Sequence, residues 1–477
     1  MRTVWIGISL AGLVSASAVE AQFQNRGGRP PAGGPPVEAV EACKQQRLGA
    51  ACAFEAPHGR VEGSCRKVPE GMVCVPNNRR FGPPPGRIGA GEKELPRGGP
   101  RQETKPAVIQ LNPLEPTFSP SKNKGATAQN KVPDSGQSYC FTNRQKVPCA
   151  DIQSRFRGQD GHHTARRAYR DNGDGTVSDL VTGLRWQQGH NAQRLTYADA
   201  KAACSRLELA GKAAWRLPTI TELFSISDWH DKQGRQHYID DRYFELKEPK
   251  PEILINDPYS STHNISMMGQ TWSSTEYVGE IALRSTARHV FFFNFLDGRI
   301  KAAPKQGNAR LFYRCVTGEP WGDNLFQNNR NGTVTDAALE LMWQQKDDGQ
   351  PRDWSQSLAY CEGLSLAGHN DWRLPNIKEL QTLVDYRYNE PAIDPRFFKQ
   401  QDKTGWFWSS TTHGESPAMA SYICFGPCTS VDGEDVHGAG AQRSDPKTGN
   451  PARWQARGGQ RDETRIFNYA RCVRDVD

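Results

Sequence analysis

The sequence predicts an α+β protein whose larger part consists of two tandem domains of the same fold. The main observation is an internal duplication with a constant offset of 157 positions. The matching pairs are Trp186 and Trp343, Cys204 and Cys361, Trp215 and Trp372, and Cys315 and Cys472. A unit of about 150 residues has the length of one compact domain, whereas solenoid repeats have periods of about 20 to 50 residues. Each copy also places helix patterns between strand patterns in the same order, which indicates α+β units.

The first 21 residues have the pattern of a secretory signal peptide. Arg2 precedes an apolar run from Val4 to Val19, and small residues stand before Gln22. No later segment approaches the ~20 apolar residues of a membrane span. We therefore expect an exported protein in the periplasm, at the cell surface or outside the cell, without a transmembrane segment after cleavage.

The region before the repeats divides into three parts. Residues 22–42 are rich in Pro and Gly, residues 43–76 form a small four-cysteine module, and residues 77–138 form a flexible basic linker. The cysteines of the module are Cys43, Cys52, Cys65 and Cys74. Their wide spacing favours disulfides among themselves over a zinc site, and three connectivities are open. Between Gln22 and Cys140 there are seventeen Lys or Arg against ten Asp or Glu, which favours anionic partners or, alternatively, a solvated linker.

The first repeat, residues 139–318, opens with a predicted hairpin. Asn172–Asp179 combines a turn with an alternating strand, and Val181–Trp186 is the return strand. Thr196 and Asp199 predict the start of a helix that carries Cys204, and Thr219-Ile-Thr-Glu222 is a capping box for a second helix. After a long loop come Trp272-Ser-Ser-Thr275, a strand pair from His289 to Ile300 and a final strand that contains Cys315.

The second repeat, residues 319–477, has the same order. Its first helix begins at Asp353, its second at Asn376-Ile-Lys-Glu379, and Trp408-Ser-Ser-Thr411 follows the loop. We expect one long-range bridge in each copy, Cys204–Cys315 and Cys361–Cys472, from the first helix to the last strand. Two further bridges, Cys140–Cys149 and Cys424–Cys428, are expected to close short loops.

These motifs resemble the Lcl C-terminal domain family, named for a bacterial collagen-like surface adhesin. The resemblance rests on Leu-x-Trp-Gln, Trp-Arg-Leu-Pro-x-x-x-Glu-Leu, Trp-Ser-Ser-Thr and Arg-Cys-Val, and covers both copies. It implies a C-type-lectin-like α+β fold for each repeat and, for the adhesin, binding of sulfated anionic glycans. The chain has no collagen-like Gly-X-Y tract, so the adhesin's stalk does not carry over.

Residues found in both copies are expected to have structural roles. We expect the tryptophans in the core and each Arg of Arg-Leu-Pro either on backbone carbonyls or paired with the Glu of its capping box. This structural set comprises Trp186, Trp215, Arg216, Glu222, Trp272, Trp343, Trp372, Arg373, Glu379 and Trp408. Ligand recognition is then expected where the copies differ.

Metal and cofactor chemistry finds little support. Asn172-Gly-Asp174-Gly175 imitates part of an EF-hand loop, but Arg170 and Val181 stand where calcium requires carboxylates. We predict no metal site and no cofactor. Formylglycine-generating oxidases use a lectin-like fold and a cysteine pair, so Cys424 and Cys428 are the one enzymatic alternative, as a redox-active bridge.

The copies differ most in their loops. The first copy is 21 residues longer between its Trp-Arg-Leu-Pro and Trp-Ser-Ser motifs, and the second is 21 longer between Trp-Ser-Ser and its last cysteine. The excess of the second copy carries a cationic, Gly-rich set with one tryptophan: Arg443, Lys447, Arg453, Trp454, Arg457 and Arg461. Arg binds anions and Trp stacks on sugar rings, so this set is the candidate ligand-binding surface, with a disordered insertion as the alternative.

The sequence therefore predicts an exported, disulfide-bonded binding protein and no enzyme. The expected partner is an anionic glycan or another cell-envelope polymer, and nucleic acid is not expected for an exported chain. The alternative is a structural or assembly subunit of an envelope complex that binds protein, and an oxidoreductase is the third hypothesis.

Overall fold

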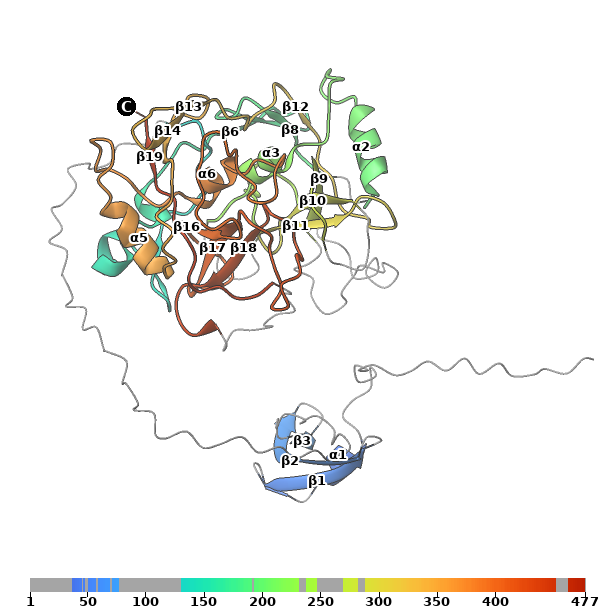
Figure 1. The fold of residues 1–477 in the computed structure, drawn as a ribbon. Helices are drawn as coiled ribbons and strands as arrows, with labels where there is room; N and C mark the ends of the chain where they lie inside the picture. The colour runs from blue at the N-terminus through green and yellow to red at the C-terminus, as the bar shows by residue number, and fades with distance from the viewer. Residues whose placement is uncertain are drawn as a thin grey trace, which may run out of the picture. The chain divides into compact units, whose positions relative to one another are not determined.

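The computed structural model describes residues 37–44, 46–47, 50–56, 59–68, 71–76, 130–190, 193–230, 237–246, 269–281, 288–451 and 462–476. The chain divides into two compact units, Met1–Leu114 and Glu115–Asp477 (Figure 1). The expected signal peptide and nearly all of the expected linker lie outside the described residues. Within the described part of the chain, no helix is long and apolar enough to cross a membrane.

The N-terminal unit is the four-cysteine module. It consists of helix α1 (Val37–Glu41) and an antiparallel sheet of β1 (Ala51–Ala56), β2 (Gly59–Val68) and β3 (Gly71–Pro76). Its bridges are Cys43–Cys65 and Cys52–Cys74. The sequence left three connectivities open. The structure contains this one, in which Cys65 and Cys74, although opposite each other on neighbouring strands, bond to different partners.

In its described residues, the first repeat contains two antiparallel sheets and the α-helices α2 and α3. One sheet has the order β12-β8-β7-β6 and the other β11-β10-β9. The elements are β6 (Tyr169–Asp171), β7 (Thr176–Asp179), β8 (Arg185–Gln187), α2 (Tyr197–Ser205), α3 (Ile220–Ser225), β9 (Gln270–Glu276), β10 (His289–Asn294), β11 (Arg299–Pro304) and β12 (Val316–Thr317). The predicted hairpin is β7–β8, and the predicted final strand is β12.

The second repeat has the same elements in the same order. Its sheets have the orders β13-β14-β15-β19 and β16-β17-β18. The elements are β13 (Phe326–Asn328), β14 (Thr333–Asp336), β15 (Leu341–Gln344), α5 (Trp354–Glu362), α6 (Ile377–Thr382), β16 (Trp406–Thr412), β17 (Met419–Cys424), β18 (Gln442–Pro446) and β19 (Val473–Asp475). The fold is therefore α+β, with mostly antiparallel sheets and short helices.

Helix starts follow the sequence closely. Thr219 and Asn376 each accept a hydrogen bond from the backbone N–H of the Glu three residues later, and that Glu accepts one in return, so both capping boxes are present. Thr196 caps α2 in the same way through Asp199 N. Such caps satisfy backbone N–H groups that have no partner within the helix.

Disulfides join the first helix of each repeat to the residue directly before its last strand. Cys204 bonds Cys315 and Cys361 bonds Cys472, with the same sequence separation of 111 residues. The structure thus contains both expected long-range bridges, and all four cysteines are buried. Each bridge closes the part of the repeat from its first helix to its last strand into one loop, which restricts the unfolded chain.

The two repeats are packed into one body rather than strung as separate domains. A single hydrophobic cluster contains Trp186, Phe224 and Phe291 of the first repeat together with Trp343 and Trp408 of the second. Equivalent elements meet at the contact: α3 lies against α6, and β11 lies against β18 (Figure 1). Contact of like with like is the property of a two-fold interface, so the repeats are related by an approximate two-fold axis.

Charged side chains are buried where β11 meets β18. Arg299 Nη2 donates to Glu415 Oε2 at 2.5 Å and to Ser444 Oγ at 2.9 Å, which joins the repeats across the interface. Lys301 pairs with Asp297 at 2.7 Å within the first repeat. Because charges that leave water need partners, this pairing constrains how the repeats fit together.

A segment before the first repeat covers the second repeat. This lead-in, residues 130–165, contains β4 (Cys140–Phe141), β5 (Lys146–Val147), and the 3-10 helices η1 (Cys149–Asp151), η2 (Ser154–Phe156) and η3 (Asp160–His162). Cys140 and Cys149 form the expected bridge. The helix η2 contacts α5, and η3 contacts β16.

The start of the lead-in corrects the expected linker boundary at residue 138. Val132 and Gln137 are buried, and Asn130 Nδ2 donates to Glu379 Oε1 and Asp475 Oδ1 at 3.3 and 2.9 Å. The sequence could not show this, because the residues that bury 130–138 lie some 250 positions further along the chain.

The segment between the repeats contacts the first repeat, and the lead-in contacts the second repeat. Between the repeats, Trp321 N donates to Glu222 Oε1 at the first turn of α3. Before the repeats, Asn130 contacts Glu379, the matching residue of α6. Each repeat is therefore crossed by the segment that leads into the other, and the two repeats are expected to unfold together.

Removal of residues 130–138 is expected to destabilise the second unit. A variant that begins at Tyr139 loses the buried Val132 and the contacts of Asn130 and Gln137, and should be about 3 kcal/mol less stable than one that begins at Glu115. Chemical denaturation of the two oxidised proteins measures the difference. Equal midpoints would mean that the lead-in adds no stability.

The pH dependence of stability is expected to contain a contribution from Asp160. Burial, and next the nearby Asp134, raise the pKa of Asp160 to about 7 from 3.8. A raised folded-state pKa contributes stability that is complete below pH 3.8 and is lost as pH rises through about 7. Asp160→Asn cannot titrate, so wild type should lose stability relative to this variant between pH 3.8 and about 7, with no further loss at higher pH, in thermal denaturation.

The control for this experiment is Asp151→Asn, which changes an exposed carboxylate of the same lead-in. It should leave the wild-type pH profile unchanged. If Asp160→Asn also follows the wild-type profile, the carboxyl of Asp160 does not ionise in this pH range.

Candidate functional site

The Arg and Glu of the shared Arg-Leu-Pro motif form a fork-like ion pair in both repeats. Arg216 donates to both carboxylate oxygens of Glu222 at 2.6 Å. Arg373 does the same to Glu379 at 2.6 and 2.7 Å and also reaches Asp475 at 2.9 Å. The same Glu residues complete the capping boxes, so each ion pair joins the Arg-Leu-Pro segment to the start of the helix that follows it.

The Arg of the Arg-Cys-Val motif holds the carbonyls of the Trp-Gln-Gln motif. Arg471 Nη1 donates to Gln344 O and Gln345 O at 2.9 and 2.7 Å. Arg314 makes the equivalent contacts to Gln187 O and Gln188 O. Burial lowers the pKa of Arg314 to about 9 and that of Arg471 to about 10. Sequence analysis missed this role, although the two motifs recur together in both copies.

The shared tryptophans are core residues, as expected. Trp186, Trp272, Trp343, Trp372 and Trp408 are at most 1% exposed, and Trp215 is 3% exposed. The indole N–H groups of Trp272 and Trp408 donate to Leu195 O and Arg352 O, which attaches the loop before the first helix to the sheet. The residues that both copies share therefore build the scaffold.

The oxygen-rich turn of each hairpin is occupied internally. Asp174 Oδ1 accepts from Thr176 N at 3.1 Å, and Asn331 Oδ1 accepts from Thr333 N at 3.2 Å. These are turn contacts, and they use the oxygens that calcium would need. Among described residues, the clusters with metal-ligand geometry both contain disulfide-bonded cysteines, Cys43, Cys52 and Cys74 in one and Cys140, Cys149 and His162 in the other.

Two residues of the candidate ligand surface are not on the surface. Arg443 lies in β18 and Lys447 directly after it, and each is only 1% exposed. The expectation that they face a ligand is wrong. The reason is tertiary: the lead-in covers Lys447, and β18 packs against β11 of the other repeat. Arg453, Trp454, Arg457 and Arg461 lie outside the described residues.

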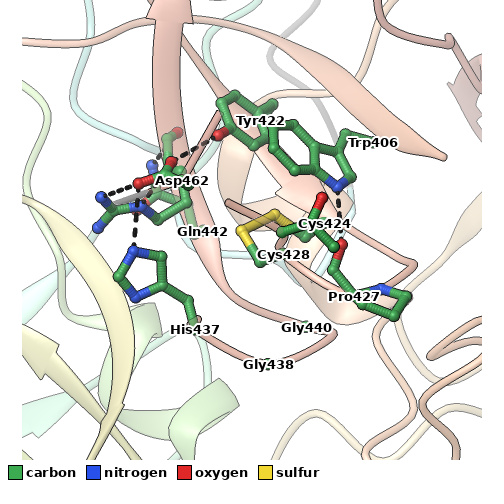
Figure 2. Close-up of a disulfide and its surroundings, with 12 residues drawn as sticks. Trp406, Tyr422, Cys424, Pro427, Cys428, His437, Gly438, Gly440, Gln442 and Asp462 are labelled. Atoms are coloured by element: carbon green, nitrogen blue, oxygen red, sulfur yellow. Dashed lines mark hydrogen bonds and ion pairs between the residues drawn. A yellow bond between two sulfur atoms is a disulfide. The ribbon is translucent and has the colours of Figure 1, made fainter. Parts of the chain in front are cut away.

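Arg443 belongs to a buried network centred on Asp462. Arg443 donates to Asp462 through Nη2 at 2.7 Å and Nε at 3.2 Å. Tyr422 Oη donates to Asp462 Oδ2 at 3.1 Å, and His437 Nε2 lies 3.1 Å from Oδ1 (Figure 2). The network joins β17, β18 and the segment at His437 to Asp462. Asp462 directly follows residues 452–461, which we call the cationic stretch.

The charges in this network are well defined. Arg443 and His437 offset burial and hold the pKa of Asp462 well below its usual range, so it is a carboxylate. Burial lowers the pKa of His437 to about 4, so its imidazole is neutral at neutral pH. Since a carboxylate only accepts, the Nε2 of His437 must carry the proton that it donates.

The Cys424–Cys428 bridge lies close to this network (Figure 2). Both cysteines are 0% exposed. Trp406 Nε1 donates to Pro427 O at 3.0 Å, and Val436 N donates to Cys428 O at 3.0 Å, so the loop is fixed on both sides. Thiol–disulfide exchange requires access of an attacking thiolate, and this buried position favours a local staple over a redox site.

The described residues on both sides of the cationic stretch, residues 452–461, are held by side-chain contacts. The cationic stretch begins after Pro451 and returns at Asp462, whose side chain is clamped by Arg443, Tyr422 and His437. Lys447, shortly before the stretch, is held by Thr412 Oγ1 at 2.7 Å and lies 3.9 Å over the ring of Trp354. Fixed flanks reduce the entropy lost when a loop binds a ligand.

Comparison with protein families identifies the repeats. The family model of the Lcl C-terminal domain matches residues 175–317 and 332–442, which together are more than half of the chain. The second match ends at Gln442, so the cationic set from Arg443 onward lies beyond it. No curated protein matches the chain.

Loss of the Asp462 carboxylate is expected to destabilise the second unit. Asp462→Asn leaves Arg443 buried without this counter-ion, which should lower the free energy of unfolding by about 3 kcal/mol. Chemical denaturation measures the change. The matched control is Asp432→Asn, an exposed carboxylate in the segment between β17 and β18, which should change stability by less than about 0.5 kcal/mol. Similar stability of the two variants would contradict the clamp.

Proposed function

This chain belongs to the Lcl C-terminal domain family, with two tandem copies of the domain, and we propose that it is an exported binding protein for an anionic glycan or another cell-envelope polymer. The observation that carries the proposal is the cationic stretch of the second repeat. It is inserted between Pro451 and Asp462, and the latter is clamped in the buried network. The shared parts of the two copies are used for the scaffold, which leaves this difference between them as the candidate for recognition.

The residues of this stretch suit anionic sugars. Arg453, Arg457 and Arg461 offer guanidinium groups whose planar fork matches sulfate and carboxylate, and Trp454 offers a ring face for stacking on a sugar. No acidic residue stands between Pro451 and Asp462. The local charge is therefore purely positive, which favours a polyanion.

A lectin-like fold and an oxidising compartment are parts of the same proposal. The family resemblance implies a C-type-lectin-like fold, and antiparallel sheets with two helices and a helix-to-strand disulfide support it. All twelve cysteines pair, which is typical of exported proteins and supports the signal peptide proposed for residues 1–21.

The alternative function is that of an assembly subunit that binds protein in an envelope complex. Packing of the repeats around shared cores and interfacial ions favours it, because such a rigid body is suited to a scaffold. The two functions differ in their dependence on salt. Binding of a polyanion through Arg weakens steeply as salt screens the charges, whereas a mainly apolar protein interface does not.

Neutralisation of the three arginines is expected to weaken binding to a sulfated polymer. The variant Arg453→Gln, Arg457→Gln, Arg461→Gln should elute from immobilised heparin at lower salt and bind about tenfold more weakly, because each Arg contributes an ion pair. The thermal midpoint should change little, because the proposal assigns these arginines to ligand binding and not to contacts within the fold.

The matched control neutralises three exposed cations of the first repeat, Lys201, Arg206 and Lys212. It removes the same net charge and should leave heparin binding nearly unchanged. A second control deletes the basic linker from Arg79 to Lys124 and keeps the lead-in from Asn130 intact. If the linker deletion abolishes binding and the triple Arg change has no effect, the repeats do not read the anion, and the assembly function replaces the glycan function.

A further inference from the structure

The duplication supplies two versions of one surface. In the first repeat, Trp272 pairs with Phe292 and Phe292 with Lys301, and in the second Trp408 pairs with Tyr422 and Tyr422 with Arg443. This register and the 157-residue offset of the first helices match four residues of one repeat to four of the other. Both sets lie near the end of the first strand of the three-stranded sheet. We call these sets the strand-end faces: Tyr197, Thr275, Glu276 and Lys305 in the first repeat, and Trp354, Thr411, Thr412 and Lys447 in the second.

The strand-end face of the second repeat is occupied by the lead-in. Gln137 holds the backbone of Thr412 from both sides: Thr412 N donates to Gln137 Oε1 at 2.9 Å, and Gln137 Nε2 donates to Thr412 O at 3.0 Å. Thr411 Oγ1 donates to Asp160 Oδ2 and accepts from Ile377 N. A carboxamide side chain that pairs with one backbone residue in this way acts as an added strand partner at a sheet end.

Aromatic contacts complete the occupied face. The ring of Phe156 lies 6.4 Å from that of Trp354, and Lys447 Nζ lies 5.7 Å from the ring centre of Phe141. As a result Trp354, Thr411, Thr412 and Lys447 are all at most 1% exposed. The lead-in thus occupies this face as a peptide ligand would, although it is part of the same chain.

The strand-end face of the first repeat has the same framework, and among the described residues no segment like the lead-in covers it; Tyr197 is buried, whereas Thr275, Glu276 and Lys305 are half-buried. Thr275 Oγ1 accepts from Ile220 N at 2.9 Å, as Thr411 does from Ile377. Lys305 Nζ donates to Glu276 Oε1 at 2.6 Å, at the place where Lys447 contacts Thr412. The side chains of Lys305 and Glu276 are 31% and 34% exposed, and no described residue holds the backbone of Glu276 as Gln137 holds that of Thr412.

The chain order explains why only one face is filled. The segment before the first repeat extends over residues 130–165 and reaches the second repeat. The segment between β12 and β13, residues 318–325, is short; Trp321 N contacts Glu222 at α3, and Asn324 Nδ2 contacts Thr382 O at the end of α6. It has no counterpart of η2 and η3.

We propose that the strand-end face of the first repeat is a docking site for an extended polypeptide segment of a partner protein, which binds there as the lead-in binds the second repeat. The segment presents a Gln or Asn side chain to the backbone of Glu276 and an aromatic side chain toward the start of α2. Opposite Thr275 it carries an uncharged acceptor or a basic group in place of Asp160, because the carboxylate of Glu276 stands where the second repeat has neutral Thr412 and repels an acid.

The test uses two synthetic probes and a charge reversal. The probes are oxidised peptides of residues 132–164, one with the natural Asp160 and one with the substitution Asp160→Asn, titrated against the full chain in a calorimeter. Wild type should bind one equivalent of the substituted peptide, about tenfold more tightly than the natural peptide. The variant Glu276→Lys should reverse this preference, because its charge now attracts Asp160.

The control is Lys212→Glu, a charge change on an exposed residue beyond the far end of α2, which should leave the preference of wild type intact. A peptide that merely displaced the lead-in from the second repeat would face Thr412 and would not respond to Glu276. Failure of both peptides to bind, or a preference that Glu276→Lys does not alter, would overturn the proposal.

Discussion

Burial of charge between the repeats constrains the whole second unit. Where β11 meets β18, Arg299 reaches across to Glu415 and Ser444, and further into the second repeat Arg443 is paired with Asp462. The buried Arg299 is stable in this position only with its partners in place, so a shift of one repeat against the other would separate it from Glu415 and Ser444. The approximate two-fold arrangement, with α3 on α6 and β11 on β18, is the geometry in which these pairs and the shared core coexist.

Inside each repeat a second set of contacts is made twice. A disulfide joins the first helix to the last strand, an Arg–Glu fork joins the strand entry to the second helix, and a buried Arg binds the carbonyls of the Trp-Gln-Gln motif. In these contacts, the side chains that both copies share bind to other parts of the same fold. Function is consequently sought in the parts that differ: the cationic stretch of one copy and the strand-end face of the other.

The lead-in breaks the symmetry of the two repeats. It adds Phe156, Gln137 and Asp160 to the second repeat and nothing equivalent to the described part of the first. Among the described residues, the duplication has therefore produced one copy of this surface that the lead-in covers and one that it does not. A protein of this design can use the second repeat as a fixed base while the first retains a surface for a partner.

Local features of this structure could be predicted from sequence because they depend on neighbouring residues or on the duplication. Capping boxes at Thr219 and Asn376 need only a residue and the Glu three positions later. The bridges Cys204–Cys315 and Cys361–Cys472 follow from a repeated order of elements, and core tryptophans from motifs that occur twice.

Tertiary structure alone decided which face of each element is buried. Arg443 and Lys447 have the composition of an exposed cationic loop, yet β11 and the lead-in, far away in sequence, remove them from water. The contacts of Asn130, which the sequence placed in the linker, depend on Glu379 and Asp475 in the same way. The sequence by itself determined the helices, the strands and their repetition. Burial depends on two surfaces that meet, so it was decided only when segments far apart in the sequence came together in the tertiary structure.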